Sequence, residues 1–461
     1  MKKIFYAIVA LAVLASCQTM DQEPTTAIRD DSAIESVDAL EFALSGAYYL
    51  ATGRGQLSLV AEMAIYADEL GPDSDVQNGS GQYAQRIHER SITPLDSWGA
   101  YAPLYRGLAA INKALAASTK LEDQEGAEPI VAELIGLRGL LHFHLATFFA
   151  PIPTSGSSNT MGIVLSTQVY PDDYKGARAS LEETYAQIIK DLTTYIDSGF
   201  NMDEMNGRLN HWAAVAIRSR DYLYWGKYEE ALADAKYVIE NSPYTLYTIA
   251  NYAHVWKGDV GSEIILQYAQ DDDYNAQRYA PGYYTHPDGY TEYLVTEDFY
   301  EFMTENPADI RSQLVGWRLD EDGEEVGPFP LKYPGKSGSK VPLYSHSIKV
   351  VRLSEMYLIA AECELKLNGA DAAVPYLNTL RQNRIEDYED ATTTDIDDIL
   401  NERRKELFSE GQIAFDLWRN GKTIQSGARS FEPDNYQNVL PIPKDEIDFC
   451  GASVLVQNPG Y

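Results

Sequence analysis

Positive charge is scarce in this sequence. Its 461 residues include 37 lysines and arginines against 69 aspartates and glutamates, so the formal net charge is −32. A surface this acidic repels the phosphate backbone of nucleic acids and the headgroups of anionic lipids. We therefore exclude nucleic-acid binding and adsorption to an anionic bilayer.

Recognisable catalytic and metal-binding patterns are also missing. The sequence has no Gly-x-Ser-x-Gly nucleophile elbow. His88 and Glu89 begin like a zinc-peptidase motif, but Ile92 stands where the second histidine must be. Asp271 opens a stretch like a calcium loop, in which Ala276 takes the place of the required glycine. We expect no catalysis, no metal and no cofactor, although 69 acidic residues leave a glycosidase carboxylate pair open.

The apolar run at the N-terminus is too short to span a membrane. Lys2 and Lys3 precede apolar residues 4–14, whereas a spanning helix takes about 20 residues. A basic start followed by a short apolar core is typical of a secretory leader, which we assign to residues 1–16. Its removal takes away two positive charges and moves the net charge from −32 to near −34.

Cysteine is rare as well, and the first of the three cysteines has a particular setting. Leu14-Ala15-Ser16-Cys17 resembles a bacterial lipobox, in which the cysteine is lipidated and becomes the mature N-terminus. Residues 17–31 are polar and indicate a flexible tether between the lipid and the folded body. A simple secretory signal with a chance cysteine is the alternative. Cys363 and Cys450 remain, and we expect them not to pair.

Amphipathic helical patterns follow from residue 32 onward. Leu353, Met356 and Tyr357 share one helix face, and Asn368-Gly369 ends that helix before a second one begins at Asp371. Small alanines on both helices allow close packing, which is typical of a helix pair in a repeat protein.

Residues 208–243 form the clearest repeat unit, with its first helix over residues 212–225. The residues that match the second half of a tetratricopeptide repeat are Gly226, Tyr228, Ala231 and Pro243. We count about four helix pairs in the chain. The sequence therefore predicts a mostly α fold: a single domain over residues 32–461 in which tetratricopeptide-like pairs form a right-handed superhelical scaffold.

Residues 251–347 break the helical pattern and are rich in glycine, proline, aspartate and tyrosine. Residues 318–326 are typical of a hairpin with an Asp-Gly turn. We predict a loop-rich insertion that contains short β-hairpins and lies against the helical scaffold. Earlier in the chain, residues 57–70 indicate a helix and residues 71–97 a long polar loop.

Tyrosines are concentrated in the insertion, on a segment that also holds prolines and glycines. The apolar face of a sugar ring stacks on an aromatic ring while neighbouring polar groups hold its hydroxyls. The candidate ligand contacts are Tyr279, Tyr283, Tyr284 and Tyr290, with Trp256 and Trp317 as secondary candidates. The alternative for each ring is that it fills a helix interface or a half-buried loop.

The polar loop over residues 71–97 supplies a second set of candidates. Long loops inside a compact body are usually functional or disordered. Its side chains that are able to hydrogen-bond sugar hydroxyls include Asp73, Asn78, Tyr83 and Arg86. The alternative is a solvated loop that contacts no ligand.

Two segments near the end of the chain carry a resemblance to a known family. Residues 399–421 resemble the motif Ile-x-x-Glu-Arg-x-x-Glu-Leu-x-x-Glu-Gly-x-x-x-x-Asp-Leu-x-Arg of SusD/RagB-type outer-membrane lipoproteins. The matching residues are Glu402, Arg403, Glu406, Leu407, Glu410, Gly411, Asp416, Leu417 and Arg419. Residues 440–461, with Leu-Pro-Ile-Pro at the start and Asn-Pro-Gly-Tyr at the end, resemble the family's closing pattern. Phe449-Cys450-Gly451 departs from the Asn-Pro-Asn that the family commonly carries there.

The resemblance implies a lipid-anchored outer-membrane protein that faces the cell exterior and binds glycans. Family members work beside a SusC-type TonB-dependent transporter, as the lid over its barrel, and deliver oligosaccharide to it. The resemblance also implies contact with the membrane only through the N-terminal lipid. Some relatives carry peptides, so a RagB-type peptide importer stays open as an alternative. A surface glycoside hydrolase and a helical scaffold without a small ligand are the remaining alternatives.

Overall fold

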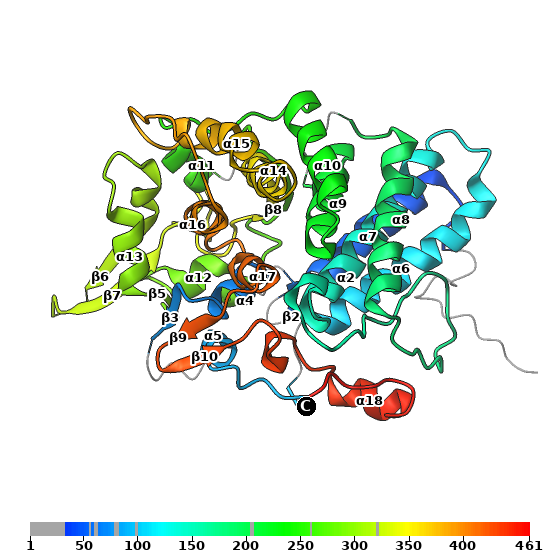
Figure 1. Cartoon of the computed structure of the whole chain (residues 1–461). Helices are drawn as coiled ribbons and strands as arrows, with labels where there is room; N and C mark the ends of the chain where they lie inside the picture. The colour runs from blue at the N-terminus through cyan, green and yellow to red at the C-terminus, as the bar shows by residue number, and fades with distance from the viewer. Residues whose placement is uncertain are drawn as a thin grey trace, which may run out of the picture.

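The computed structural model describes residues 33–54, 57–59, 63–77, 83–96, 100–202, 207–258, 261–319 and 322–461. The leader, the tether, Cys17 and Asn78 lie outside the described residues. The structure is mostly helical, as the sequence predicts, and its strands are short (Figure 1).

Helices that follow one another in the chain also contact one another. The helices of this scaffold are α2 (Val37–Thr52), α6 (Tyr101–Ser118), α7 (Ala127–Phe149), α8 (Leu181–Ser198), α9 (His211–Trp225), α10 (Tyr228–Asn241), α14 (Leu353–Asn368) and α15 (Ala370–Gln382). They pack as α2 with α6, α7 with α8, α9 with α10 and α14 with α15, while α10 also packs on α14 (Figure 1). This arrangement is consistent with tetratricopeptide-like pairs.

Local sequence signals explain where several of these helices begin and end. Ser180 and Glu183 form the capping box that starts α8, since the Ser180 hydroxyl accepts from the Glu183 amide at 3.1 Å and the Glu183 carboxylate accepts from the Ser180 amide at 2.8 Å. Gly226 ends α9 with a φ of 77°, a conformation that glycine adopts readily. Helix α7 is apolar enough to span a membrane by length and composition, but 78% of its most apolar window is buried in the protein. It is the central core helix.

The predicted insertion holds short helices and strands, seen on the left of Figure 1. These elements are α11 (Tyr252–Gly258), β4 (Ile264–Tyr268), η4 (Gln277–Tyr279), α12 (Pro281–Thr285), β5 (Tyr293–Val295), α13 (Glu297–Thr304), η5 (Ile310–Leu314), β6 (Val315–Leu319), β7 (Glu325–Pro330) and β8 (Ile348–Arg352). Strands β6 and β7 pair antiparallel, which confirms the predicted hairpin. Strand β4 pairs antiparallel with β8, which leads directly into α14.

The prediction of one helix over residues 57–70 is confirmed only in part, because Leu59, Met63 and residues 66–69 are helical whereas Leu57 and Ser58 are extended. Besides β1 (Gly53–Arg54), the chain forms β2 (Leu57–Ser58) and the single turn α4 (Tyr66–Glu69). Residues 64–71 are all buried, so their apolar side chains do not mark one face of a surface helix. The polar segment that follows is also more regular than expected, because it contains β3 (Ser74–Val76) and α5 (Tyr83–His88).

The remaining elements lie between the scaffold helices or near the C-terminus. They are η2 (Thr119–Leu121), η3 (Pro153–Ser155), α16 (Ile396–Leu407), α17 (Ile413–Arg419), β9 (Ile424–Ser426), β10 (Arg429–Phe431), η6 (Tyr436–Asn438) and α18 (Lys444–Cys450). Cys363 on α14 and Cys450 on α18 are both buried and free, so the expectation that they do not pair is confirmed.

Three glutamates of the C-terminal motif take part in a buried network of ion pairs, which we call the ion network. Its positive side chains are Arg311, Lys332, Arg352 and Arg384, and its carboxylates are Glu263, Asp309, Glu402, Glu406 and Glu410. Buried charges are tolerated where each one is paired and hydrogen-bonded. The motif glutamates therefore serve the fold.

Glu406 is the centre of the ion network. Its Oε1 accepts from Arg352 Nη1 and from Arg384 Nη2, each at 2.9 Å, and Arg311 Nη1 lies 3.3 Å from Oε2. Burial alone would raise the pKa of Glu406, but Arg384 and Arg352 hold it well below its usual value. Arg311 precedes β6 and Arg352 ends β8, so these contacts join the insertion to α16.

Two further motif residues are explained by the packing around them. Arg419 binds Asp416 at 2.8 Å and Glu362 at 2.6 Å, which joins α17 to α14. Gly411 has a φ of +75°, and a Cβ atom there would lie 1.7 Å from the Met63 carbonyl oxygen. Only glycine fits this close approach to the segment before α4.

We predict that Glu406→Gln strongly destabilises the protein. The change keeps the shape of the side chain but leaves Arg352 and Arg384 buried with too little negative charge, and breaking a buried ion pair costs about 3–5 kcal/mol. Urea unfolding followed by circular dichroism measures the free energy of unfolding. The matched control is Lys444→Ala, which removes the exposed Lys444–Asp448 pair and should change stability by less than about 1 kcal/mol. An equal effect of the two changes would contradict the prediction.

The buried carboxyl group of Asp68 on α4 should make the stability of the protein depend on pH. Burial raises the pKa of Asp68 to about 8, although the Gly411 amide and Lys332 lower it. Between pH 4 and 8 the folded chain keeps a proton that the unfolded chain loses, so this group's stabilisation falls as the pH rises, by about 1.4 kcal/mol per pH unit. Asp68→Asn should remove this slope in urea unfolding at pH 5, 6, 7 and 8, whereas the exposed Asp371→Asn should retain it. Equal slopes for wild type and Asp68→Asn would refute the assignment.

Candidate functional site

Strand pairing brings the two sets of predicted ligand contacts together. Strand β3, in the polar segment after α4, pairs antiparallel with β5 of the insertion, with Ser74 opposite Val295 and Val76 opposite Tyr293. The amide of Thr296 also donates to the Asp73 carbonyl at 2.9 Å. The polar segment over residues 71–97 and the tyrosine-rich part of the insertion are therefore neighbours, although the paired strands β3 and β5 are more than two hundred residues apart in the sequence.

Four tyrosines form one group in the insertion, which we call the tyrosine cluster: Tyr283, Tyr284, Tyr290 and Tyr344. The ring centroid of Tyr283 lies 4.8 Å from that of Tyr290 and 5.1 Å from that of Tyr344. The ring of Tyr284 lies 5.8 Å from that of Tyr290. Of the four, Tyr283, Tyr290 and Tyr344 are half-buried, so part of each is open to solvent.

The backbone around the tyrosine cluster is tightly folded. The Tyr290 amide donates to the Tyr283 carbonyl at 2.7 Å, and a Cβ atom at Gly289 would lie 2.1 Å from the same oxygen. Arg278 adds a charge beside the rings, and hydrogen bonds with Tyr290 and Tyr344 raise its pKa. The segment thus offers ring surfaces next to hydroxyl and guanidinium groups on a constrained loop.

The other aromatic residues predicted to contact a ligand are more deeply buried than Tyr283 and Tyr290, or pack against the main core. Tyr284 and Trp256 are each 1% exposed. Trp256 packs between ion-network cations, 4.7 Å from Lys332 Nζ and 5.3 Å from the Arg352 guanidinium carbon. Its ring stabilises the core and presents no surface to a ligand. Tyr279 is half-buried against the main core.

Trp317 is half-buried on β6, and its ring lies 5.1 Å from that of Tyr300 in an edge-on arrangement. Its indole Nε1 has no hydrogen-bond partner among the described residues. Because this nitrogen is buried, only the exposed part of the Trp317 ring is open to a ligand, and its role in binding stays a prediction.

The polar candidates of the 71–97 segment are used differently from one another. Asp73 is buried and binds Arg404 of α16, with Oδ1 at 2.5 Å from Nη2. Arg86 on α5 pairs with Asp96 at 2.5 Å and remains partly exposed. Asn78 lies outside the described residues, and Tyr83 begins α5 with a side chain that is not described. Asp73 thus anchors its segment to α16, while Arg86 remains available at the surface.

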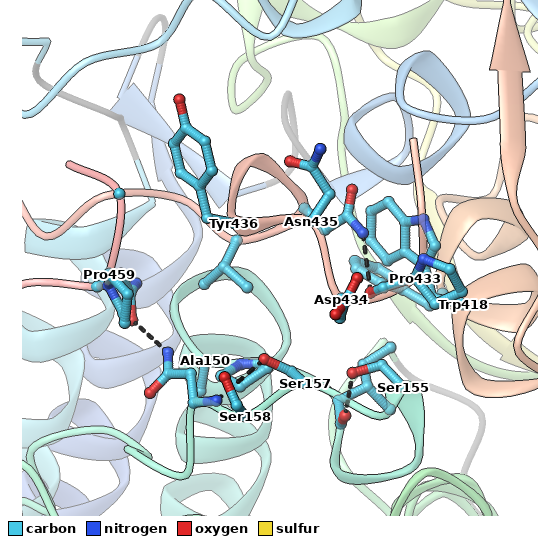
Figure 2. A pocket seen from close by; sticks show the side chains of 18 of the residues that line it. Ala150, Ser155, Ser157, Ser158, Trp418, Pro433, Asp434, Asn435, Tyr436 and Pro459 are labelled. Atoms are coloured by element: carbon cyan, nitrogen blue, oxygen red, sulfur yellow. Dashed lines mark hydrogen bonds between the residues drawn. The ribbon is translucent and has the colours of Figure 1, made fainter. Parts of the chain in front are cut away.

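A cavity that the sequence patterns did not indicate lies near the C-terminal segment, and we call it the C-terminal cavity. It has a volume of about 380 Å³ and is lined by the end of α7, residues 150–159, α17, residues 433–439 and residues 458–460. Figure 2 shows Trp418 and residues 433–435 facing Ser155, Ser157 and Ser158 across it. None of the predicted ligand contacts lines this cavity.

Two asparagines hold the walls of the C-terminal cavity in place. Asn458 accepts from Arg178 at 2.8 Å and donates to the carbonyls of Phe149 and Leu440 at 3.0 and 2.8 Å. Asn438 accepts from Arg90 at 2.6 Å and donates to the Glu432 and Pro433 carbonyls, each at 3.0 Å. These hydrogen bonds fix the wall that the closing pattern of the sequence builds.

The closing pattern was the sequence signal that could have found the cavity. Its Gly460 has a φ of +96° and lies so close to Tyr436 that a Cβ atom would come within 2.4 Å of the ring. The Tyr461 ring packs edge-on against Tyr436 with centroids 5.2 Å apart. The pattern resembles the family's closing segment, but the sequence alone does not show that its two halves and α17 surround one space.

Metal-binding geometry is missing from the described part of the chain. Among those residues, no group of three or more histidines, cysteines, aspartates and glutamates could hold a metal ion. His142 and His144 on α7 are buried in the protein interior, and this burial lowers the pKa of each to about 3. His144 Nε2 is hydrogen-bonded to the Tyr268 hydroxyl at 2.7 Å, and His142 Nε2 accepts from the Ser166 amide at 3.0 Å.

Comparison with protein families gives three matches. Residues 240–461 match the family described as "SusD family", and residues 21–223 match the family "Starch-binding associating with outer membrane". Residues 1–18 match a prokaryotic membrane lipoprotein lipid attachment site. The last match covers the predicted leader and Cys17.

Individual relatives agree with these matches. SusD-like protein P25 of Formosa agariphila is 22% identical and aligns with 96% of this chain and 97% of its own. A SusD superfamily protein of Bacteroides thetaiotaomicron has a similar structure, with a TM-score of 0.84 and 27% identity over 92% of this chain and 100% of its own. A laminarin-binding SusD-like protein shares the fold at a TM-score of 0.73, with 20% identity over 92% of this chain and 99% of its own. With adjoining family matches over both halves and solved relatives that share its fold over nearly the whole length, this chain belongs to the SusD family of lipid-anchored outer-membrane proteins.

Proposed function

We propose that this protein binds oligosaccharides at the outer face of the outer membrane and passes them, uncleaved, to a SusC-type TonB-dependent transporter. The observation that carries the proposal is the tyrosine cluster, with Arg278 and the paired 71–97 segment beside it. Family membership, the lipid attachment site and a laminarin-binding structural neighbour support it.

The chemistry of the tyrosine cluster suits a sugar better than an ion or a flat apolar ligand. A pyranose has apolar C–H faces that pack on aromatic rings and a rim of hydroxyls that needs hydrogen bonds. Tyr283 and Tyr290 supply half-exposed rings, and their hydroxyls together with Arg278 supply polar partners. Because the two rings stand nearly perpendicular, at 82°, they form a corner that a bent oligosaccharide fits.

A protein that delivers intact oligosaccharide to a transporter must bind the oligosaccharide without hydrolysing it. Hydrolysis of a glycosidic bond needs two carboxyl groups that face one cleft, about 5 to 9.5 Å apart. Asp73 is the one carboxylate among the predicted ligand contacts, and it is paired with Arg404. The proposal therefore assigns no catalytic group, and the N-terminal lipid is its membrane anchor.

We predict that Tyr283→Ala and Tyr290→Ala weaken binding of laminarihexaose or maltoheptaose by at least about fivefold each, since removing an aromatic contact of this kind costs about 1 kcal/mol or more. Tyr284 is left intact because its buried ring supports the other two. Isothermal titration calorimetry on the lipidated protein in detergent gives the affinity. Tyr237→Ala, a half-exposed tyrosine on α10, is the matched control and should bind as the wild type does.

Three results would contradict the proposed function. Unchanged affinity in both tyrosine variants would place the glycan elsewhere. New reducing ends after incubation with the glycans would show an enzyme. Binding of peptides but of no glycan would show a peptide carrier. Melting temperature gives an independent check, because a true ligand stabilises the folded state by RT ln(1 + [L]/Kd).

A further inference from the structure

The C-terminal cavity is separate from the tyrosine cluster. It shares no lining residue with that cluster or with the 71–97 segment, and it is built by α7, α17 and the last residues of the chain. Its volume of about 380 Å³ lies near the lower end of the roughly 300–1,000 Å³ range of small-molecule sites. This size suits a ligand as small as one or two sugar rings.

Several polar groups in the cavity remain available, in contrast to the saturated Asn438 and Asn458. Asp434 is exposed and its carboxylate makes no hydrogen bond or ion pair within the described residues. Asn435 uses its carbonyl oxygen to accept from the Gln437 amide at 2.9 Å, which leaves its NH₂ group without a partner in the same set. Ser158 adds an exposed hydroxyl on the facing wall (Figure 2).

Trp418 gives a second, independent indication of a ligand. It lines the cavity, is 2% exposed, and its indole Nε1 has no hydrogen-bond partner among the described residues. A buried donor without an acceptor is unfavourable, so such a group in a native protein calls for an explanation. Because the Nε1 atom is itself buried, a hydroxyl oxygen of a ligand in the cavity reaches it only when the Trp418 side chain shifts toward the cavity.

The charge of the residues that line the C-terminal cavity determines which sugars it can bind. Among the described lining residues there is no lysine, arginine or histidine, and Asp434 is the single charged side chain. Arg90 and Arg178 lie behind the walls, where Asn438, Asn458 and backbone carbonyls occupy their donors. A sulfate or carboxylate on the ligand would therefore face Asp434 with no cation to balance it, whereas a neutral hydroxyl or an ammonium group would be favourable.

We propose that the C-terminal cavity is a second carbohydrate site of this protein, which takes a neutral or amino sugar unit and rejects anionic ones. This inference rests on the proposed glycan-binding function, and it adds the location of a second binding site and the class of sugar that the site binds. Tyr436 provides aromatic surface, the largely buried Trp418 forms part of the wall, and Asp434, Asn435 and Ser158 bind the hydroxyls. The hydrogen bonds of Asn438 and Asn458 keep the site formed before the ligand arrives, which lowers the entropy cost of binding.

The test uses the lipidated protein in detergent and calorimetric titration with maltose, laminaribiose, cellobiose, glucosamine and digalacturonate. We expect at least one of the first four to bind and digalacturonate not to bind. The double variant Asp434→Ala/Asn435→Ala should weaken that binding at least tenfold, and Trp418→Phe, which removes only the donor and part of the ring, at least threefold. Tyr283→Ala/Tyr290→Ala should still bind the small sugar.

The matched control is Asp371→Ala/Asn241→Ala, an exposed aspartate and asparagine outside both sites, which should bind as the wild type does. If the small sugars bind and the cavity variants retain full affinity while the tyrosine variants lose it, the second site is refuted and the proposed function stands. Binding of digalacturonate that depends on Asp434 and Asn435 would also overturn the inference. If no glycan binds the wild type at all, both proposals fail.

Discussion

The pairing of buried arginines with the glutamates of α16 is the constraint on which the rest of the structure depends. Glu406 lies buried between Arg352 and Arg384, so each charge is tolerated only because the others are present. These side chains come from the strand before α14, from the residues just after α15 and from α16. The network therefore determines how the insertion rests on the helical scaffold, and with it where β5 and the tyrosine cluster lie.

The helical part of the fold was predictable from the sequence because its signals are local. The capping box of Ser180 and Glu183 and the stop at Gly226 specify helix ends without reference to the rest of the chain. The stretch over residues 57–70 was predicted only in part, since residues 64–71 are buried on all sides and apolar periodicity does not distinguish such a segment from a surface helix.

The candidate site was only partly predictable, for a related reason. Tyr283 and Tyr290 were found because aromatic residues on a proline- and glycine-containing segment are a compositional signal. The burial of Trp256 depends on Lys332 and Arg352, which the sequence does not place near it. The C-terminal cavity requires Trp418 and Asn435 to meet across a space that also involves the end of α7, and such long-range proximity has no local signature.

The ion network has a consequence for the way in which this chain can be divided. Its charges are contributed by segments on both sides of the boundary between insertion and scaffold, so neither part can bury its own charges when the other is absent. An excised insertion would carry Arg311 without Glu402 and Lys332 without Glu410. A scaffold from which the insertion had been deleted would leave Arg352 and Arg384 without Glu263. We therefore expect the two parts to unfold as one cooperative unit, and we expect that binding loops can be exchanged between relatives only together with the network residues.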